Sequence, residues 1–268
     1  MKHRDMLSYF GLTALPFTKE IATRDLQMLP SVERNLAAAR LLVDTRGIGV
    51  ITGKAGTGKS CLLRLLADSL PPGLYKSFYV CHSSVGIVEF YTHLVTVFGL
   101  EACYRRAAMF RDLKDHILAM NTSSHIHPVL LIDEAHMLNN DILAEIRLLT
   151  NYQIDSMNAL TVVLCGAETL SRKFGLSMLE ALANSITITI SVDGLPKDET
   201  FSYIETRLAA CGVKQPLLTK NAMELIHQAA GGILRTVGTI ASAALVKAFL
   251  ATSHQVEAEL FLKHLRGC

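Results

Sequence analysis

The stretch that decides the fold of this 268-residue chain is Gly49-Val50-Ile51-Thr52, followed directly by Gly53-Lys54-Ala55-Gly56-Thr57-Gly58-Lys59-Ser60. The second part fits the phosphate-binding loop pattern G-x-x-x-x-G-K-[ST] at every defined position. A run of strand type precedes the loop, and a leucine-rich helical pattern at residues 62–66 follows it. Because strand, loop and helix occur in the order that the pattern requires, the stretch predicts a P-loop in an α/β fold.

This loop offers several contacts to a polyphosphate. Its glycines let successive backbone N–H groups surround an anion, and the next helix points its partial positive charge at the same place. Lys59 is predicted to reach the β- and γ-phosphates, and the Ser60 hydroxyl to bind Mg²⁺. We therefore expect ATP and Mg²⁺ as ligands, with nucleotide contacts from Gly53, Lys54, Ala55, Gly56, Thr57, Gly58, Lys59, Ser60 and Cys61.

Two carboxylates follow a second apolar run, Val129-Leu130-Leu131-Ile132, as in a Walker B strand. An acid at the carboxyl end of a parallel strand lies in the crevice where ligands bind. Asp133 is therefore expected to help Ser60 hold Mg²⁺, and Glu134 to polarise the attacking water. Solvated acids at a strand end are the alternative, which the P-loop in the same chain disfavours. The tetrad at residues 133–136 also matches one helicase class, but other helicase motifs are not evident.

Apolar runs of strand type alternate with helical patterns through most of the chain. Beyond the two already quoted, they lie at residues 78–81, 161–164 and 186–190. Continuous apolar strands separated by helices indicate a parallel sheet covered on both faces. After the turn cluster at 193–196 only helical patterns recur. We expect an N-terminal arm at residues 1–30 packed on the ATPase core, an α/β nucleotide-binding domain at 31–192, and an all-helical domain at 193–268.

Composition places the chain among globular proteins. Hydrophobic residues make up 50% and charged residues 19%, which excludes disordered and low-complexity classes. The net charge of +2 singles out neither nucleic acid nor acidic membranes as a partner. The six cysteines form no CxxC pair of zinc or redox type. With no signal-peptide pattern at the start and no membrane span, we expect a cytoplasmic location and no membrane partner.

The order of P-loop, Asp-Glu strand and helical end resembles an AAA+ ATPase, in which the helical part is the lid. Further segments are similar to the ExeA-like ATPases, a group that includes transposition helper ATPases of the TnsC and MuB type and a general secretion ATPase. These segments are Phe10-Gly11-Leu12, Pro16-Phe17, Arg147-Leu148-Leu149-Thr150-Asn151 and Cys165-Gly166-Ala167-Glu168-Thr169-Leu170. The resemblance implies a P-loop NTPase sheet with helices on both faces and a small helical lid.

The resemblance also implies roles for arginines. Arg235 matches the place of the family's sensor 2 arginine, which reaches from the lid to the γ-phosphate, although Leu234 replaces the usual proline. Relatives often carry an arginine finger before the fifth strand, and residues 182–186 contain none. Such a finger contributes roughly 10³- to 10⁵-fold in phosphoryl transfer. We therefore expect slow, Mg²⁺-dependent and partner-regulated ATP hydrolysis, with Arg235, Lys59, Asp133 and Glu134 as the residues that carry it.

A basic segment at residues 103–115 holds four basic and two acidic side chains. Its candidates for contact with DNA phosphates are Arg105, Arg106, Arg111 and Lys114. Charge alone favours a solvated helix face, while the resemblance to DNA-binding ATPases favours phosphate contact. The sequence therefore favours neither a solvated helix face nor a DNA-binding surface over the other.

Two functions compete. The leading hypothesis is an ATP-dependent regulator of mobile-element transposition, which oligomerises on double-stranded DNA as a ring or helical filament and recruits a transposase and other transposition proteins. The alternative is the cytoplasmic ExeA-like ATPase module of a secretion or envelope assembly complex. Secretion relatives carry a membrane span after the ATPase, whereas this sequence stops at Cys268, so we expect transposition. A clamp loader or helicase loader is disfavoured by Phe10-Gly11-Leu12 and Pro16-Phe17.

Overall fold

The computed structural model describes residues 3–18, 20–81, 86–153 and 156–258. By their contacts these residues fall into two compact units. The first, which we call the α/β unit, comprises residues 34–54 and 59–192. The second, which we call the helical unit, comprises the described parts of residues 1–33, 55–58 and 193–268.

A parallel sheet forms the centre of the α/β unit. Its five strands, counted over the described residues, are β1 (Ile48–Thr52), β2 (Tyr75–Val80), β3 (His127–Ile132), β4 (Thr161–Gly166) and β5 (Ile186–Ser191). They lie in the order β2-β3-β4-β1-β5, and each neighbouring pair is parallel. Each strand that the apolar runs predict is present, which confirms the predicted sheet.

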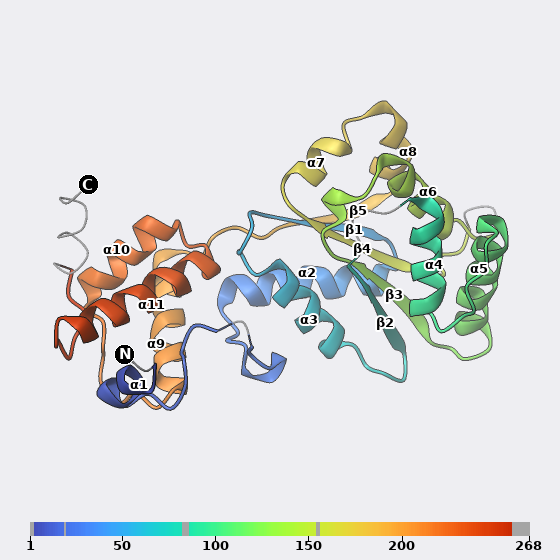
Figure 1. Cartoon of the computed structure of the whole chain (residues 1–268). Coiled ribbons are helices and arrows are strands. Elements are labelled where there is room, and N and C mark those ends of the chain that lie inside the picture. The colour runs from blue at the N-terminus through green and yellow to red at the C-terminus, as the bar shows by residue number, and fades with distance from the viewer. Residues whose placement is uncertain (1–2, 19, 82–85, 154–155, 259–268) are drawn as a thin grey trace. The chain divides into compact units, whose positions relative to one another are not determined.

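Helices cover both faces of this sheet because consecutive strand residues point in opposite directions. Leu130 and Ile132 belong to one buried cluster, and Val129 and Leu131 to the other. The first cluster is covered by α4 (Ile87–Val97), α5 (Arg106–Thr122) and α6 (Asn140–Thr150), and the second by α2 (Pro30–Thr45) and α3 (Lys59–Ser69). Figure 1 shows the two sets of helices on opposite sides of the strands. The predicted fold class, an α/β P-loop sheet with helices on both faces, is confirmed.

Short helical segments complete the α/β unit: two follow the carboxyl ends of β3 and β4, and two precede β5. They are η2 (Ala135–Met137), α7 (Thr169–Lys173), η3 (Ser177–Leu179) and α8 (Glu180–Ala183). Among them, η2 directly follows the Asp-Glu pair and packs beside β4. This position brings it to the site described below.

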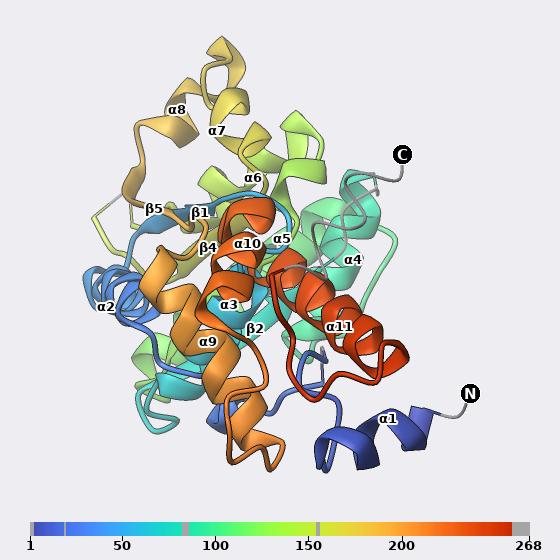
Figure 2. The same cartoon turned by 90° about the vertical axis from the view of Figure 1, so that its left-hand side faces the viewer.

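Three longer helices build the helical unit: α9 (Lys197–Ala210), α10 (Lys220–Ala230) and α11 (Leu234–Leu250). Figure 2 shows these three helices in orange and red. The Thr219 side chain accepts the Ala222 N–H at 3.2 Å and caps α10, and Gly231 ends that helix at φ +56°. None of the helices in the described residues has the length and apolarity that crossing a bilayer requires.

The N-terminal segment differs from the expected extended arm on the ATPase core. It begins with helix α1 (His3–Phe10), followed later by the short turn η1 (Thr23–Asp25), and it packs within the helical unit. Met6, Phe10 and Leu12 are buried in one cluster with residues of α9, α10 and α11. Met6 and Phe10 are four residues apart and therefore share one helix face. That apolar stripe makes the segment an amphipathic helix and explains the difference.

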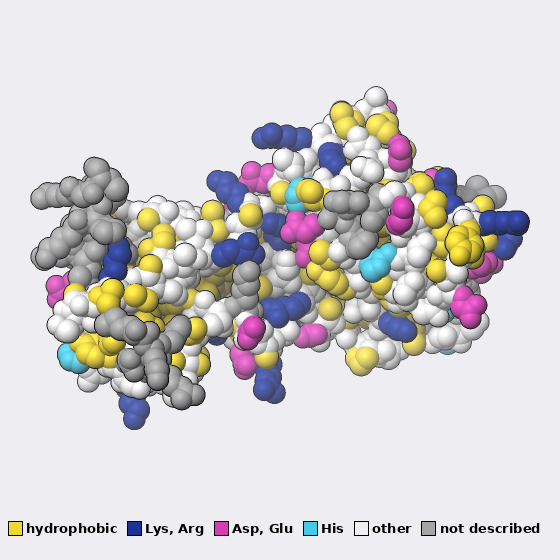
Figure 3. Space-filling view, viewed as in Figure 1, with side chains coloured by type: hydrophobic (Ala, Val, Ile, Leu, Met, Phe, Trp, Pro, Cys, Tyr) yellow, Lys and Arg dark blue, Asp and Glu magenta, His cyan; other side chains and the backbone are white. Residues whose placement is uncertain are grey.

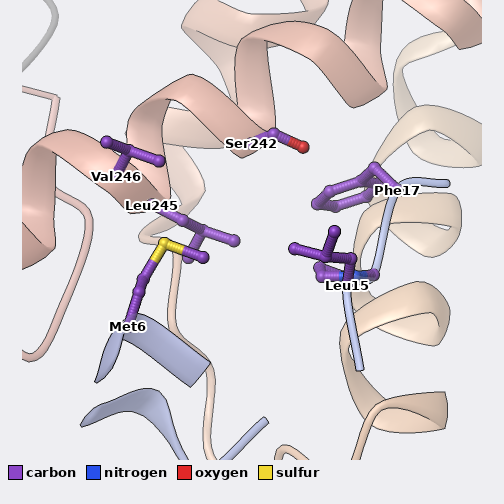
Figure 4. A pocket seen from close by; sticks show the side chains of 7 residues that line it. Met6, Leu15, Phe17, Ser242, Leu245 and Val246 are labelled. Carbon is purple, nitrogen blue, oxygen red and sulfur yellow. The ribbon is translucent and has the colours of Figure 1, made fainter. Parts of the chain in front are cut away.

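A small cavity of about 170 Å³ lies inside the helical unit. Its lining is Met6, Leu15, Pro16, Phe17, Ser242, Leu245 and Val246. Figure 4 shows Leu15 and Phe17 across the cavity from Met6, Leu245 and Val246. Because no titratable side chain lines it, this cavity offers apolar packing and no chemistry.

Candidate nucleotide site

The loop after β1 has the backbone that a phosphate-binding loop needs. Gly56 and Gly58 have φ values of +86° and +104°, which side chains of L-residues rarely tolerate. A loop with positive φ at these glycines turns successive N–H groups toward one point and forms a concave site for an anion. Thr57 and Lys59, between and after these glycines, are both buried. The loop therefore keeps its polar residues in fixed positions.

The Lys59 ammonium is held inside its own loop. It donates to the carbonyl oxygens of Gly53 and Lys54, each at 2.9 Å, and the residue is only 8% exposed. Two carbonyl acceptors reduce the cost of burying a charged group. The cation is thus positioned by the loop rather than extended into solvent.

Ser60 and Asp133 meet although they are far apart in the sequence. The Ser60 hydroxyl donates to Asp133 Oδ2 at 2.8 Å, and the Glu134 N–H donates to Oδ1 at 2.9 Å. Asp133 is only 4% exposed. A hydroxyl beside a carboxylate supplies the hard oxygen ligands that Mg²⁺ prefers, so these two residues fit the predicted metal. Burial and the Asp133 carboxylate raise the pKa of the neighbouring Cys165 thiol, which keeps that thiol neutral.

Tyr79 is a member of the site that sequence reasoning missed. It lies on the edge strand β2, opposite Leu131, and its hydroxyl donates to Asp133 Oδ2 at 3.2 Å. Burial first, and then the Asp133 carboxylate, raise the pKa of the phenol, so it remains a donor. A tyrosine in a strand has no sequence signal for this role, because the contact requires the pairing of β2 with β3.

Glu134 lies at the point where the chain leaves β3. Its φ of +53° is in the left-handed region, which is uncommon for a residue with a side chain. The turn leads into η2, which places His136 beside Glu134. The His136 Nδ1 lies 3.3 Å from Glu134 Oε2. The same Nδ1 accepts the Ala167 N–H at 3.2 Å. Like Tyr79, His136 was not predicted as a site residue, although it is part of the tetrad at residues 133–136.

Two further predicted nucleotide contacts lie on helices. Cys61 is half-buried in the first turn of α3, where its sulfur accepts from Arg64 Nη2 at 3.7 Å. Arg235 is exposed at the start of α11. Its backbone N–H donates to the Gly56 carbonyl at 3.1 Å, a contact within the helical unit. The role of the Arg235 side chain stays a prediction.

The four basic candidates for DNA contact have different surroundings. Arg106 pairs with Glu145 at 2.6 Å, and Lys114 donates to the Asn151 carbonyl and lies 4.4 Å from the Tyr152 ring centre. Burial lowers the pKa of Lys114. Arg105 and Arg111 are exposed, although Arg111 lies 3.5 Å from Asp112. Figure 3 shows basic and acidic side chains mixed over the region of α5. Arg105 and Arg111 are the members most accessible to a phosphate.

Comparison with known families identifies the domain that contains the loop and the Asp-Glu pair. Residues 41–174 match a family model described as an AAA domain, which is half of the 268 residues. The chain belongs to the AAA domain family. Both the P-loop and the Asp133-Glu134 pair lie inside the matched residues. The predicted AAA+ fold is therefore confirmed by sequence as well as by structure.

One curated relative of this AAA-domain chain is General secretion pathway protein A of Aeromonas hydrophila. It is 31% identical over 255 residues, which cover 92% of this chain and 46% of that protein. The chain thus spans less than half the length of this relative. The match supports the predicted similarity to ExeA-like ATPases.

Solved structures share the fold of this AAA-domain chain. Drosophila ORC bound to DNA has a TM-score of 0.70 at 15% identity, over 99% of this chain and 67% of that one. Cdc6p from Pyrobaculum aerophilum has a TM-score of 0.67 at 16% identity, over 90% and 67%. The RuvB K64R mutant of Thermotoga maritima has a TM-score of 0.57 at 17% identity, over 87% and 68%. At such identities the likeness concerns the fold alone.

Proposed function

We propose that this AAA-domain chain is a Mg²⁺-dependent ATPase that serves as the ExeA-like module of a secretion or envelope assembly complex. The observation that supports the ATPase part is the hydrogen bond from Ser60 to Asp133. Glu134 directly follows Asp133, and Lys59 is buried next to Ser60 in the loop. The secretion part is supported by the 31% identity to General secretion pathway protein A. The secretion module replaces transposition as the leading hypothesis, because the sequence identity to a secretion protein favours it.

Each residue of the site has one task in the proposed reaction. Lys59 and the loop N–H groups bind the β- and γ-phosphates, and Ser60 and Asp133 hold Mg²⁺. Bound Mg²⁺ supplies positive charge to the phosphate oxygens. Glu134 orients the attacking water and accepts its proton. Arg235 contacts the γ-phosphate and makes the helical unit sensitive to whether ATP or ADP is bound.

The test of this proposal is Mg²⁺-ATP hydrolysis by the purified chain together with calorimetric binding of ATP. Lys59→Ala removes the cation that the loop directs at the phosphates, so the affinity for ATP should fall at least tenfold, about 1.4 kcal/mol. Lys76→Ala, on β2 beside the Phe78 ring, removes the same charge elsewhere in the α/β unit and is the matched control. If the parent binds no ATP, or if Lys59→Ala binds it as tightly as the parent, the assignment of the P-loop is wrong.

Assembly is the proposed use of the nucleotide. An assembled state that contacts the γ-phosphate binds ATP more tightly than ADP. ATP therefore shifts the chain toward that state, and ADP does so less. We therefore expect a ring or helical filament of this chain with a non-hydrolysable ATP analogue and not with ADP. Analytical ultracentrifugation in the two nucleotides measures this directly, and equal mass in both would contradict nucleotide-driven assembly.

A second candidate function is a DNA-bound regulator of transposition of the TnsC and MuB type, acting with a transposase. The exposed Arg105 and Arg111 on the α/β unit support a phosphate-contacting surface. Two structural neighbours, Drosophila ORC bound to DNA and the Aeropyrum pernix ORC1 protein in complex with DNA, are DNA complexes of the same fold. Contacts of this kind are sensitive to salt and nearly independent of base sequence.

Fluorescence anisotropy on two unrelated duplexes across a salt series separates the two candidates. If DNA is a partner, the chain should bind both duplexes with an ATP analogue. The double variant Arg105→Ala/Arg111→Ala should then lower the salt slope by roughly one to two, about 0.9 per lost phosphate contact. Lys76→Ala is again the control. Failure of the parent to bind either duplex at low salt would leave the secretion module as the proposed function.

A further inference from the structure

One nitrogen of His136 serves two neighbours. Its Nδ1 lies 3.3 Å from Glu134 Oε2 and 3.2 Å from the Ala167 nitrogen, whose N–H it accepts. The two neighbours come from different places in the sheet, since Glu134 follows β3 and Ala167 follows β4. His136 therefore connects the ends of two adjacent strands at the site.

The two contacts exclude each other as hydrogen bonds. A ring nitrogen is either an acceptor without a proton or a donor with one. When Nδ1 accepts the Ala167 N–H with its lone pair, it carries no proton to donate to the Glu134 carboxylate. When Nδ1 carries a proton and donates to Glu134, the Ala167 N–H loses this acceptor. The ring thus has two hydrogen-bonding states, and only one of them holds the carboxylate.

The end of β4 is shaped to receive this ring. A Cβ at Gly166 would lie 3.0 Å from the His136 backbone nitrogen and 3.2 Å from Nδ1, so a larger residue would displace the ring. The side chain of His136 is only 19% exposed, whereas that of Glu134 is 49% exposed. The histidine is consequently confined while the carboxylate beside it has room to turn.

We propose that His136 is a positioning residue for Glu134, and that its Nδ1 exchanges between donating to the Glu134 carboxylate and accepting the Ala167 N–H. In the donating state the bond to Oε2 orients the carboxylate, and Oε1 keeps its lone pairs for the attacking water. In the accepting state the carboxylate is released. The end of β4 therefore competes with Glu134 for the ring. This inference rests on the proposed role of Glu134 in ATP hydrolysis.

Three substitutions at one position test the orienting role. Asn places its polar atom near Nδ1, Gln places it near Nε2, and Ala removes both. His136→Ala should lower kcat roughly tenfold with KM for ATP unchanged, because Lys59 and Ser60 remain in place. His136→Asn should restore most of the rate and His136→Gln should not. Equal rates in all three variants and the parent, or a rate that rises in His136→Ala, would overturn the proposal.

Two controls keep this test separate from the others. Thermal unfolding of each variant shows whether the chain remains folded, and a purely structural role would give the same loss in Asn and Gln. Glu134→Gln reports on the proposed function itself. If Glu134→Gln hydrolyses ATP at the parental rate, the role of Glu134 is wrong; if it is inactive while His136→Ala has the parental rate, only the present inference fails.

Long-range ¹⁵N–¹H NMR of the His136 ring reads the exchange without any turnover. The resonance is assigned by its absence in His136→Asn. In the parent we expect signals of an Nδ1 that carries a proton part of the time. In Glu134→Ala the ring should become an Nε2–H tautomer whose Nδ1 accepts from Ala167. An identical tautomer in both proteins would show that Nδ1 does not exchange between these partners.

Discussion

One histidine begins strand β3 and another lies in η2, shortly after the strand ends, and the two differ in how their ring nitrogens are used. At the amino end, His127 is 3% exposed, with Nδ1 2.9 Å from Asn121 Oδ1 and Nε2 2.9 Å from Thr161 Oγ1. Just beyond the carboxyl end, His136 shares one nitrogen between two neighbours. A ring with one partner per nitrogen is locked, whereas a ring with two partners on one nitrogen can change between them.

The surroundings of the two ends explain the difference. At the amino end, Asn121 also donates to the carbonyls of Ile117 and Ala159, so both polar atoms of its amide have partners inside the fold. Burial lowers the pKa of His127 to about 4, which keeps its ring neutral. At the carboxyl end the helices after parallel strands leave a crevice for ligands. Polar groups at one end therefore stabilise the sheet, and those at the other end are positioned for a reaction.

The largest expected effect concerns the carboxyl end. Glu134→Gln keeps the shape of the side chain and removes the charge that accepts the proton, so kcat should fall by at least about 10²-fold while ATP remains bound. The free energy of unfolding should not change. Steady-state hydrolysis and calorimetry measure the two quantities, with Glu180→Gln on α8 as a control at an exposed glutamate. A loss of stability together with activity would erase the distinction between the two ends.

The second prediction concerns the amino end. His127→Asn cannot reach both former partners and leaves a buried polar group unpaired, so it should lower the free energy of unfolding by about 2 kcal/mol. His125→Asn is the matched control, because His125 is exposed at φ +54°, a conformation that Asn tolerates. Urea denaturation compares the variants. ATP affinity should equal that of the parent in both; a tenfold change in His127→Asn would show that the ends are coupled.

The third prediction is the pH dependence that His127 causes. Its pKa in the folded chain is about 4, below the ordinary value of 6.5, so the folded state binds fewer protons than the unfolded chain between these values. Stability from this residue is present above pH 6.5 and is lost as the pH falls through that window. We expect a loss of about 1 kcal/mol between pH 7 and pH 5.5, absent in His127→Asn. Parallel slopes for parent and variant would contradict it.

The smallest expected effect compares the two ends of β2. Tyr79→Phe removes one hydrogen bond to Asp133, so the Mg²⁺ concentration for half-maximal binding of a fluorescent ATP analogue should change roughly two- to fivefold, up to about 1 kcal/mol. Tyr75→Phe, on the same strand as Tyr79, is the matched control. It removes a hydroxyl that lies 3.2 Å from Oδ1 of Asp44 in α2. Equal Mg²⁺ dependence in the two variants would remove Tyr79 from the site.

Much of the fold and the centre of the site could be predicted because their signals are local. Each strand is a short apolar run, and the loop from Gly53 to Ser60 is one contiguous pattern. Asp133 and Glu134 directly follow such a run. Residues near each other in sequence impose their geometry on one another through strand, turn and helix, so a single stretch carries the information.

The amphipathic helix α1 shows how a local signal can be overlooked. Met6 and Phe10 share one face, but the lack of a clear period and the prolines Pro16 and Pro30 made the first 30 residues resemble an extended arm. Its partners are residues of α9, α10 and α11, which lie about 200 residues away in the chain. The helix is stabilised by burying that face, and no pattern within the segment shows what buries it.

By itself, the sequence determined the α/β class, the P-loop and the Asp-Glu pair, since each depends on neighbouring residues. Only the tertiary structure decided that Tyr79 reaches Asp133, that His136 stands between Glu134 and Ala167, and that His127 is locked by Asn121 and Thr161. These contacts join β2 to β3, β3 to β4, and α5 to β3. The physical reason is that strand order and register, which no single stretch encodes, select the side chains that share hydrogen bonds.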